Sequence, residues 1–277
     1  MAEEAKGTMT YRYLGNTGLK VSVLSFGTML TNYYEEDKKN WLECAKACYD
    51  AGINYFDSAE IYGMGDGDRL LGQAIKENEW SRDTLIISVK VVYGGPGPND
   101  YGMSRKHIIE GTKASLKRIG IDYCDLLFSH RPSSYINLEE TCRAFSWLVQ
   151  KGYAKYWATS CWTAEMIAEA IEICEDLGLY KPIADQAQYN MVARNSIEVD
   201  FKRIFDRYAY GTTIYSPLAM GLLSGKYNDG EIPEDSRFGK SDAFKNFTWP
   251  SNMNENIIEE RKKMFKGLKD IADGLGC

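Results

Sequence analysis

The feature that most constrains the fold is a regular alternation of short apolar, β-branched runs with longer helical patterns. The predicted strands are Val21–Phe26, Ile53–Asp57, Leu85–Lys90, Asp125–Ser129, Tyr153–Thr159, Ile183–Gln188 and Thr212–Ser216. The predicted helices are Asp37–Ala51, Arg69–Lys76, Ser104–Ile119, Leu138–Lys151, Thr163–Leu177, Val199–Arg207 and a last helix that ends near Leu275. Such alternation implies parallel strands joined by right-handed crossovers.

Two architectures satisfy this pattern, a doubly wound sheet and an eight-fold barrel. Polar and aromatic residues gather directly after the strands, at Asp57–Tyr62, Lys90, His130–Pro132, Ser160–Trp162, Gln186 and Tyr215–Ser216. Residues delivered from many successive strands to one face suit the rim of a barrel. A doubly wound sheet would place its site at one switch point instead. The sequence therefore favours an α/β fold of the (β/α)8 TIM-barrel type.

A complete barrel needs an eighth strand, and the sequence printed here ends at Cys277. We therefore expect one barrel domain over residues 1–277 that lacks the eighth strand and the terminal helices, with residues 1–10 as a flexible tail. No internal repeat or linker divides the sequence.

Charge and composition exclude several classes of protein. With 33 basic and 39 acidic side chains, the net charge of −6 argues against binding to nucleic acid. Apolar runs are too short to predict insertion into a membrane. The scattered cysteines, 7 in number, are typical of reduced thiols in a cytoplasmic protein. Only 2 histidines are present, so we expect no metal site.

Two glycine-rich stretches resemble nucleotide-binding loops without matching them. The stretch 63–67 is followed by Asp68 where a dinucleotide loop needs its third glycine. The stretch 221–227 carries Tyr227 where a P-loop needs serine or threonine. Neither stretch predicts a nucleotide site of those two kinds.

Four residues near strand ends, Asp57, Tyr62, Lys90 and His130, form a candidate catalytic group. A tyrosine hydroxyl has a pKa near 10, and a neighbouring ammonium group favours its phenolate form. An aspartate would hold the lysine charged, and a histidine would orient a substrate oxygen. Reduction of a carbonyl needs such a proton donor. A structural ion pair and an ordinary hydrogen-bonded histidine are the alternatives.

Several stretches resemble the aldo-keto reductase family. They are Gly27–Met29, Gly52–Tyr62, Ser104–Gly111 and Tyr215–Ala219, and the resemblance extends from about Tyr11 to Cys277. Within the family, the chain is most similar to the voltage-gated potassium channel beta-subunit group and its enzymatic relatives. The resemblance implies a (β/α)8 barrel that binds NADP(H) without a Rossmann fold.

The resemblance also implies a role for each candidate residue. Tyr62 would be the general acid, Asp57 and Lys90 would tune it, and His130 would orient the carbonyl. Ser160 and Gln186 would bind the nicotinamide carboxamide, and Tyr215 would stack on its ring. The implied cofactor-binding residues are Thr28, Met29, Asp57, Ser160, Gln186, Tyr215, Ser216, Pro217, Leu218, Ala219, Met220, Lys226 and Arg237. For Lys226, a solvated loop lysine is the alternative.

The substrate pocket is predicted to include Met29, Tyr93 and Trp162, which sit just past strand ends, although core or rim packing would explain them as well. An aromatic lining favours hydrophobic aldehydes and ketones.

The sequence leaves two functions open, and an inactive, truncated relative is a third possibility. The first is an NADPH-dependent reductase of aldehydes or ketones. The second is an accessory or redox-sensing protein, similar to a channel beta subunit, with a channel partner and a homotetrameric assembly. The mammalian channel subunits carry asparagine at the place of His130 and arginine at that of Cys161, and the histidine favours a working enzyme.

Overall fold

The computed structural model describes residues 9–30, 33–132, 136–228, 232–240 and 255–276. The chain divides into two compact units, which are described one at a time. The first unit contains Met1–Ala187 and Asn195–Thr213, and the second contains Gln188–Arg194 and Ile214–Cys277. The prediction of a single domain stays a prediction, and residues 1–8 of the predicted tail lie outside the described residues.

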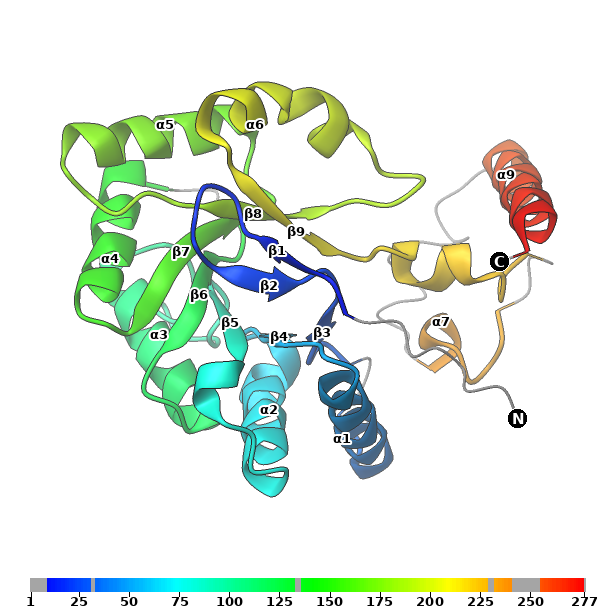
Figure 1. Ribbon diagram of the computed structural model, residues 1–277, viewed down its shortest axis with the longest axis horizontal. Helices are drawn as coiled ribbons and strands as arrows, with labels where there is room; N and C mark the ends of the chain where they lie inside the picture. Colours follow the sequence, from blue (N-terminus) through cyan, green and yellow to red (C-terminus); the bar gives the residue numbers. More distant parts are fainter. Residues whose placement is uncertain (1–8, 31–32, 133–135, 229–231, 241–254, 277) are drawn as a thin grey trace. The chain divides into compact units, whose positions relative to one another are not determined.

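The main sheet is parallel and curled, and its strand order follows the chain from β3 to β9 (Figure 1). Its strands are β3 (Ser25–Gly27), β4 (Tyr55–Asp57), β5 (Ile86–Val91), β6 (Cys124–Ser129), β7 (Ala154–Ser160), β8 (Ala184–Gln188) and β9 (Gly211–Tyr215). The order never reverses, so the sheet has no switch point of the doubly wound kind. The predicted (β/α)8-like fold is therefore confirmed over this half-barrel.

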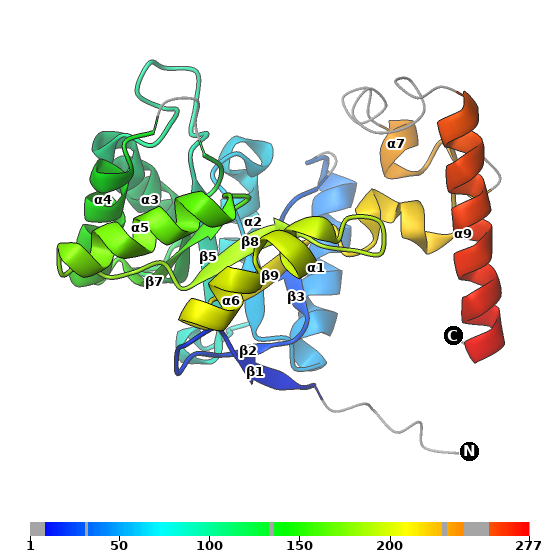
Figure 2. The same ribbon diagram turned by 90° about the horizontal axis from the view of Figure 1, so that it is seen from above.

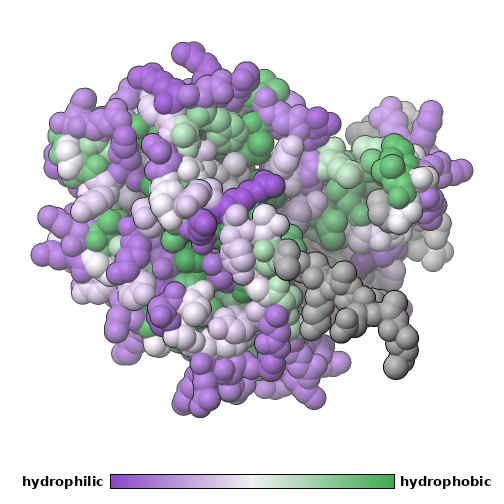
Figure 3. Space-filling model, in the orientation of Figure 1, coloured by the Kyte–Doolittle hydropathy of each residue, from purple (hydrophilic) through white to green (hydrophobic). Residues whose placement is uncertain are grey.

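Helices follow the strands and pack outside the sheet in both views (Figures 1 and 2). They are α1 (Glu35–Asp50), α2 (Asp66–Glu77), α3 (Arg105–Ile119), α4 (Leu138–Gln150), α5 (Ala164–Asp176) and α6 (Lys202–Tyr208). Short 3-10 segments, η1 (Tyr62–Gly65) and η2 (Arg82–Thr84), precede α2 and β5. The outer edge over α3, α4 and α5 is mainly hydrophilic in Figure 3, as expected for helices that bury one face.

Local sequence signals fix where these helices begin and end. The side chains of Ser104, Asn137 and Thr163 cap α3, α4 and α5 by accepting a backbone N–H from the first turn. Gly120 ends α3 with φ of 83°, a left-handed conformation that glycine adopts at little cost.

Alternate residues of the strands supply two apolar cores. On β6, Leu127 faces the helices, whereas Leu126 and Phe128 face the inside of the curled sheet. The period of two is the one that a sheet with both faces covered requires.

The first predicted strand, Val21–Phe26, is wrong as a single element. The structure has two strands there, β2 (Lys20–Ser22) and β3, which belong to different sheets. The Ser22 hydroxyl donates to the carbonyl of Leu24 at 2.6 Å, which turns the chain between them. The preceding strand β1 (Tyr11–Tyr13) pairs antiparallel with β2, and its exposed residues carry no apolar pattern that predicts it.

The β1–β2 hairpin lies at the end where the main strands begin. Ser22 N–H donates to Asn54 Oδ1 at 2.8 Å, just before β4. Figure 2 shows this hairpin at one end of the strands and the loop after β5 at the other. The carboxyl ends of the strands are thus left to the loops that carry the candidate site.

The predicted helix Val199–Arg207 is two elements, a π-helix η3 (Ser196–Asp200) and α6. The second unit contains a 3-10 segment η4 (Ala219–Ser224), α7 (Arg237–Lys240) and α9 (Glu255–Leu275), so the predicted last helix is confirmed to Leu275. A small core of Ala219, Leu222, Tyr227, Phe238 and Phe265 holds this unit together.

Candidate active site

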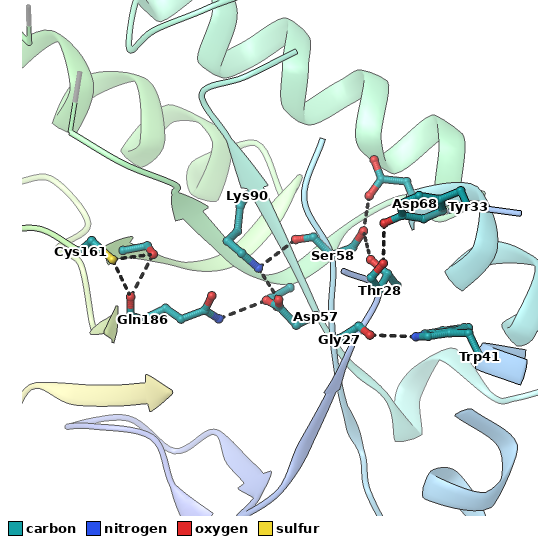
Figure 4. A network of polar contacts seen from close by, with 12 residues as sticks. Gly27, Thr28, Tyr33, Trp41, Asp57, Ser58, Asp68, Lys90, Cys161 and Gln186 are labelled. Carbon is teal, nitrogen blue, oxygen red and sulfur yellow. Dashed lines mark hydrogen bonds and ion pairs between the residues drawn. The ribbon is translucent and has the colours of Figure 1, made fainter. Parts of the chain in front are cut away.

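A buried carboxylate–ammonium pair lies at the carboxyl ends of β4 and β5. The Lys90 ammonium group donates to Asp57 Oδ2, and the Lys90 side chain is 0% exposed. Strand register explains the meeting, because Asp57 pairs with Ser88 and so places its side chain beside that of Lys90. Figure 4 shows the two side chains pointing toward each other.

Further hydrogen bonds fix both members of the pair. Asp57 Oδ1 accepts from the Ser88 hydroxyl at 2.6 Å and from Gln186 Nε2 at 3.2 Å. Lys90 Nζ also donates to the carbonyl of Ser58 at 3.2 Å. Burial lowers the pKa of the Lys90 ammonium group, and Asp57 opposes that shift.

Behind this pair runs a chain of buried hydroxyl contacts, visible in Figure 4. Thr28 Oγ1 donates to Ser58 Oγ at 3.0 Å, and Ser58 Oγ donates to Asp68 Oδ1 at 2.6 Å. Asp68 on α2 is 0% exposed, and its other oxygen pairs with Arg118 of α3 at 2.9 Å. The side chain of Thr28 is therefore engaged inside the protein.

Tyr62 and His130 adjoin the pair. Lys90 Nζ lies 5.1 Å from the centroid of the Tyr62 ring. The Tyr62 and His130 rings meet edge to face with centroids 6.0 Å apart. The four residues of the predicted catalytic group thus come together at one end of the curled sheet.

The pKa of Tyr62 shifts in the direction opposite to the one that a neighbouring lysine predicts. Burial raises the pKa of the Tyr62 hydroxyl well above its usual 10.0, and the Asp57 carboxylate raises it further. The positive charge of Arg131 lowers the pKa of Tyr62, but by less than burial raises it. The physical reason is that the charge of Lys90 is balanced by Asp57, while burial penalises a phenolate directly.

His130 is held in its neutral form. Burial lowers the pKa of its imidazole to about 3, and the charges of Lys90 and Arg131 contribute. Its Nδ1 atom is buried without a hydrogen-bond partner among the described residues. In a neutral imidazole, one ring nitrogen donates a hydrogen bond and the other accepts one, so a ring nitrogen without a partner can bind a polar group of a ligand.

The two predicted carboxamide ligands lie beside this group. Ser160 Oγ donates to the backbone carbonyl of Gln186 at 2.9 Å. The Gln186 side chain is itself oriented by its contact with Asp57. Cys161 follows with φ of 56°, a strained value for a residue other than glycine, and such strain collects at ligand sites.

The predicted phosphate-binding residues belong to the second unit. Positive φ angles recur at Ser216 (52°), Ala219 (48°), Met220 (59°) and Gly221 (102°). Asn190 Nδ2 donates to the carbonyl of Ser216 at 2.9 Å. Backbone that turns in this way can aim successive N–H groups at an anion.

The remaining predicted cofactor residues of this unit lie between β9 and α7. Tyr215 is the last residue of β9, Pro217 and Leu218 lie between β9 and η4, and Lys226 is exposed after η4. Arg237 begins α7, and its side chain lies outside the described part of the chain.

The predicted pocket residues differ in exposure. Met29 is 42% exposed, and Tyr93 is half-buried with its ring centroid 5.6 Å from that of His130. Trp162 is 2% exposed in the apolar core and donates its indole N–H to Ser129 Oγ at 3.2 Å. Trp162 is therefore packed in the core, which is the alternative given above. A contact with substrate stays a prediction for Met29, Tyr93 and Trp162.

Sequence reasoning missed several residues of the site. Asp185 of β8 is 0% exposed and accepts from Thr159 Oγ1 at 2.7 Å, and burial raises its pKa to about 6. Glu60 and His107 form a second buried pair. Glu60 and His107 are far apart in the sequence, so no local pattern predicts the pair. Only the position of Glu60 just after a strand indicates that it lies near the site. The described residues contain no group of three metal-ligating side chains.

The fold and the site define a barrel-type protein with a tyrosine, a histidine and a buried lysine–aspartate pair at the carboxyl ends of its strands. A family model described as "Aldo/keto reductase family" matches residues 23–277. The chain belongs to this family, and membership supports an oxidoreductase activity. Family members generally bind NAD(P)H and act on small carbonyl compounds.

Three relatives carry channel-subunit names. A protein of Arabidopsis thaliana, named as a probable voltage-gated potassium channel subunit beta, is 46% identical over 97% of this chain and 80% of its own length. A protein of Oryza sativa subsp. japonica with the same name is 42% identical over the same shares. A protein of Schizosaccharomyces pombe with a similar beta-subunit name is 48% identical over 82% of this chain and 67% of its own. No helix of the described residues is long and apolar enough to cross a membrane.

The residues present fit a dinucleotide cofactor. The His130 ring, whose centroid lies 6.0 Å from that of Tyr62, has an Nδ1 atom without a hydrogen-bond partner among the described residues. In the second unit, positive φ angles at Ser216, Ala219, Met220 and Gly221 allow the backbone to aim N–H groups at an anion.

Proposed function

We propose that this protein is an NADPH-dependent reductase of hydrophobic aldehydes or ketones, and that Tyr62 donates the proton. The observation that carries the proposal is the buried Lys90–Asp57 pair with the Tyr62 ring 5.1 Å from the ammonium group. A buried ion pair alone adds little stability, so its position at the strand ends favours a chemical role.

Bound NADPH would supply a hydride to the carbonyl carbon, and Ser160, Gln186, Tyr215, the segment 216–220, Lys226 and Arg237 would hold it. The protein's own residues then complete the reaction. Tyr62 gives its phenolic proton to the carbonyl oxygen as negative charge develops there. The alkoxide that accepts the proton is a stronger base than phenolate, so a raised tyrosine pKa does not prevent the transfer.

The Lys90 ammonium group, held in place by Asp57, would offset only part of the charge of the phenolate that this transfer leaves behind, because Asp57 already balances its charge. His130 is neutral, so it would hydrogen-bond the carbonyl oxygen without adding charge. Tyr93 would form an aromatic wall beside His130, which favours apolar substituents on the carbonyl.

Replacement of Tyr62 by phenylalanine tests the proposal. We expect Tyr62→Phe to lower kcat for carbonyl-dependent NADPH oxidation by about 100-fold or more while NADPH binding persists. Tyr34→Phe is the matched control, because Tyr34 is 69% exposed. Undiminished turnover in Tyr62→Phe would reject the assignment of the proton donor.

A second candidate function is favoured by the names of the three relatives. In this alternative the chain is an accessory, redox-sensing subunit in the cytoplasm that binds a potassium channel as a homotetramer. Affinity capture from native membranes, with light scattering of the purified protein, tests it. Recovery of no channel together with a monomeric mass would dispose of this alternative.

A further inference from the structure

Glu60 is a buried carboxylate on the loop that joins β4 to Tyr62, and the reaction described above does not use it. The residue is 2% exposed. It lies between two residues of the site, three positions after Asp57 and two before Tyr62. Burial of an ionisable side chain costs free energy unless its oxygens are satisfied, so its partners indicate what it does.

One oxygen of Glu60 receives three N–H groups from two other segments. Oε1 accepts from the backbone of Val92 at 2.5 Å and of Tyr93 at 2.6 Å, directly after β5. It also meets His107 Nε2 of α3 at 2.9 Å. Because a carboxylate oxygen that already accepts two amides acts as an acceptor, the His107 ring donates this bond.

The surrounding backbone leaves room for this pair. A Cβ atom at Gly111 would lie 2.7 Å from Glu60 Oε2, and one at Gly94 would lie 2.8 Å from His107 Cε1. Both distances are too short for a side chain. The backbone N–H of Glu60 also donates to the carbonyl of Lys90 at 3.1 Å, which ties the loop to β5 a second time.

Both segments that Glu60 joins carry aromatic rings of the site. The backbone N–H of Tyr93 donates to Glu60, and the Tyr93 ring packs against His130 with the ring centroids 5.6 Å apart. Tyr62, two residues after Glu60, lies against the same imidazole at 6.0 Å. His130 thus contacts two rings: the backbone of one, Tyr93, donates to the Glu60 carboxylate, and the other, Tyr62, follows Glu60 on the same loop.

We propose that Glu60, held by His107, is a positioning residue that fixes Tyr93 and Tyr62 against the His130 ring. The proposal rests on the proposed reductase function for its effect on rate, whereas its effect on the order of the loop after β5 is independent of that function. Displacement of a reacting group by about 1 Å can cost about 100-fold in rate. Glu60 therefore acts through Tyr93 and Tyr62 without touching substrate.

A double-mutant cycle tests whether Glu60 acts through Tyr93. We expect Glu60→Ala to lower kcat/KM about 10- to 100-fold in the wild-type background and much less in a Tyr93→Ala background. Glu60→Gln retains an acceptor oxygen and should recover most of the lost rate. Glu110→Gln, on the exposed side of α3, is the matched control and should keep the wild-type rate.

Amide hydrogen exchange supplies a readout that does not depend on activity. In Glu60→Ala, the amides of Val92 and Tyr93 should exchange about tenfold faster or more, since each loses its acceptor. The amide of Ile171 in α5 should keep its protection. A uniform rise in exchange across the protein would instead indicate general destabilisation and would overturn the positioning role.

The outcomes separate this inference from the proposed function. Costs of Glu60→Ala and Tyr93→Ala that simply add, or unchanged exchange at Val92 and Tyr93, would overturn the inference. A wild-type protein that reduces no carbonyl would reject the proposed function alone, and the exchange measurement would then decide the positioning role. Faster amide exchange confined to Val92 and Tyr93, together with non-additive effects of Glu60→Ala and Tyr93→Ala on kcat/KM, would support both the positioning role and the proposed function.

Discussion

At the scale of single residues, the site depends on charges that are buried together. Asp57 and Lys90 neutralise each other where water is largely excluded, with side chains 13% and 0% exposed. Removing one partner leaves the other charge buried and unpaired, which costs far more than the intact pair contributes.

Asp57→Asn should therefore destabilise the protein by about 3–5 kcal/mol, measured by urea unfolding. The exposed pair Lys106–Glu110, with side chains 55% and 62% exposed, provides the comparison. Loss of that pair in Glu110→Gln should cost about 0–1 kcal/mol. Equal costs for the two substitutions would contradict the burial argument.

His130 gives the stability a defined pH dependence. Its pKa falls from the usual 6.5 to about 3 on folding, so between these values the unfolded chain binds more protons than the folded one. Its contribution to stability therefore decreases as pH falls from about 6.5 toward 3.

We expect His130→Asn to lose less stability than the wild type when pH is lowered from about 6.5 to 4, measured by the urea midpoint. Asp185 acts with the opposite sign between its usual 3.8 and about 6, but it is present in both proteins and cancels in the comparison. Parallel pH profiles for the two proteins would show that His130 is not buried in its neutral form.

The sequence predicts which of these residues meet but not how they titrate. Asp57, Lys90 and His130 follow from their positions at the ends of successive strands. The raised pKa of Tyr62 depends on burial and on the balance of the Lys90 charge by Asp57, neither of which spacing reveals. Glu60 and His107 are 47 positions apart, and no local pattern links them.

At the scale of elements, close backbone contacts decide how the helix layer packs. A Cβ atom at Gly72 of α2 would lie 2.2 Å from the backbone oxygen of Ile119 in α3. The two helices can approach this closely only because position 72 has no side chain.

Gly72→Ala should destabilise the protein by about 1–3 kcal/mol, because the helices must move apart, as thermal unfolding will show. Gly18→Ala is the control, since nothing lies within 4 Å of a Cβ atom there. A Gly72→Ala protein as stable as the control would mean that the α2–α3 contact is loose.

Element boundaries were predictable where periodicity was strong and caps were present. The helices after β5, β6 and β7 begin after Ser104, Asn137 and Thr163, and their apolar stripes are clear. The split between β2 and β3 was not predictable, because Val21–Phe26 reads as one apolar run, and a single serine contact turns the chain. A local contact from a side chain to the backbone, rather than strand propensity, decided that boundary.

At the scale of the whole molecule, a protein with a net charge of −6 is proposed to bind a polyanionic cofactor. Local cations and oriented backbone groups must therefore overcome an unfavourable overall field. Lys226, exposed after η4, is the described lysine that the family resemblance assigns to the cofactor phosphates.

Lys226→Met should raise the Kd for NADPH about fivefold at low salt, since an exposed ionic contact contributes about 1 kcal/mol or less. The difference should shrink as salt screens the contact. Fluorescence titration measures both values, with Lys202→Met on α6 as the control, because Lys202 pairs with Asp206. Equal Kd values for all three proteins would remove Lys226 from the site.

The topology of the molecule could be predicted almost entirely from the order of its strands and helices. Parallel strands in chain order leave few alternatives once crossovers are right-handed. The division into two compact units was not predictable, because composition does not change at its boundaries near residues 187 and 213.

The central claim is that this site transfers a hydride to a carbonyl carbon, and isotope transfer tests it most directly. NADPH carrying deuterium on the transferable position of its nicotinamide is mixed with the purified protein and an aromatic aldehyde under single-turnover conditions. The account predicts an alcohol with one deuterium on the former carbonyl carbon, formed by the wild type and Tyr34→Phe and almost absent with Tyr62→Phe. An unlabelled alcohol, or no alcohol from a folded protein that binds NADPH, would contradict it.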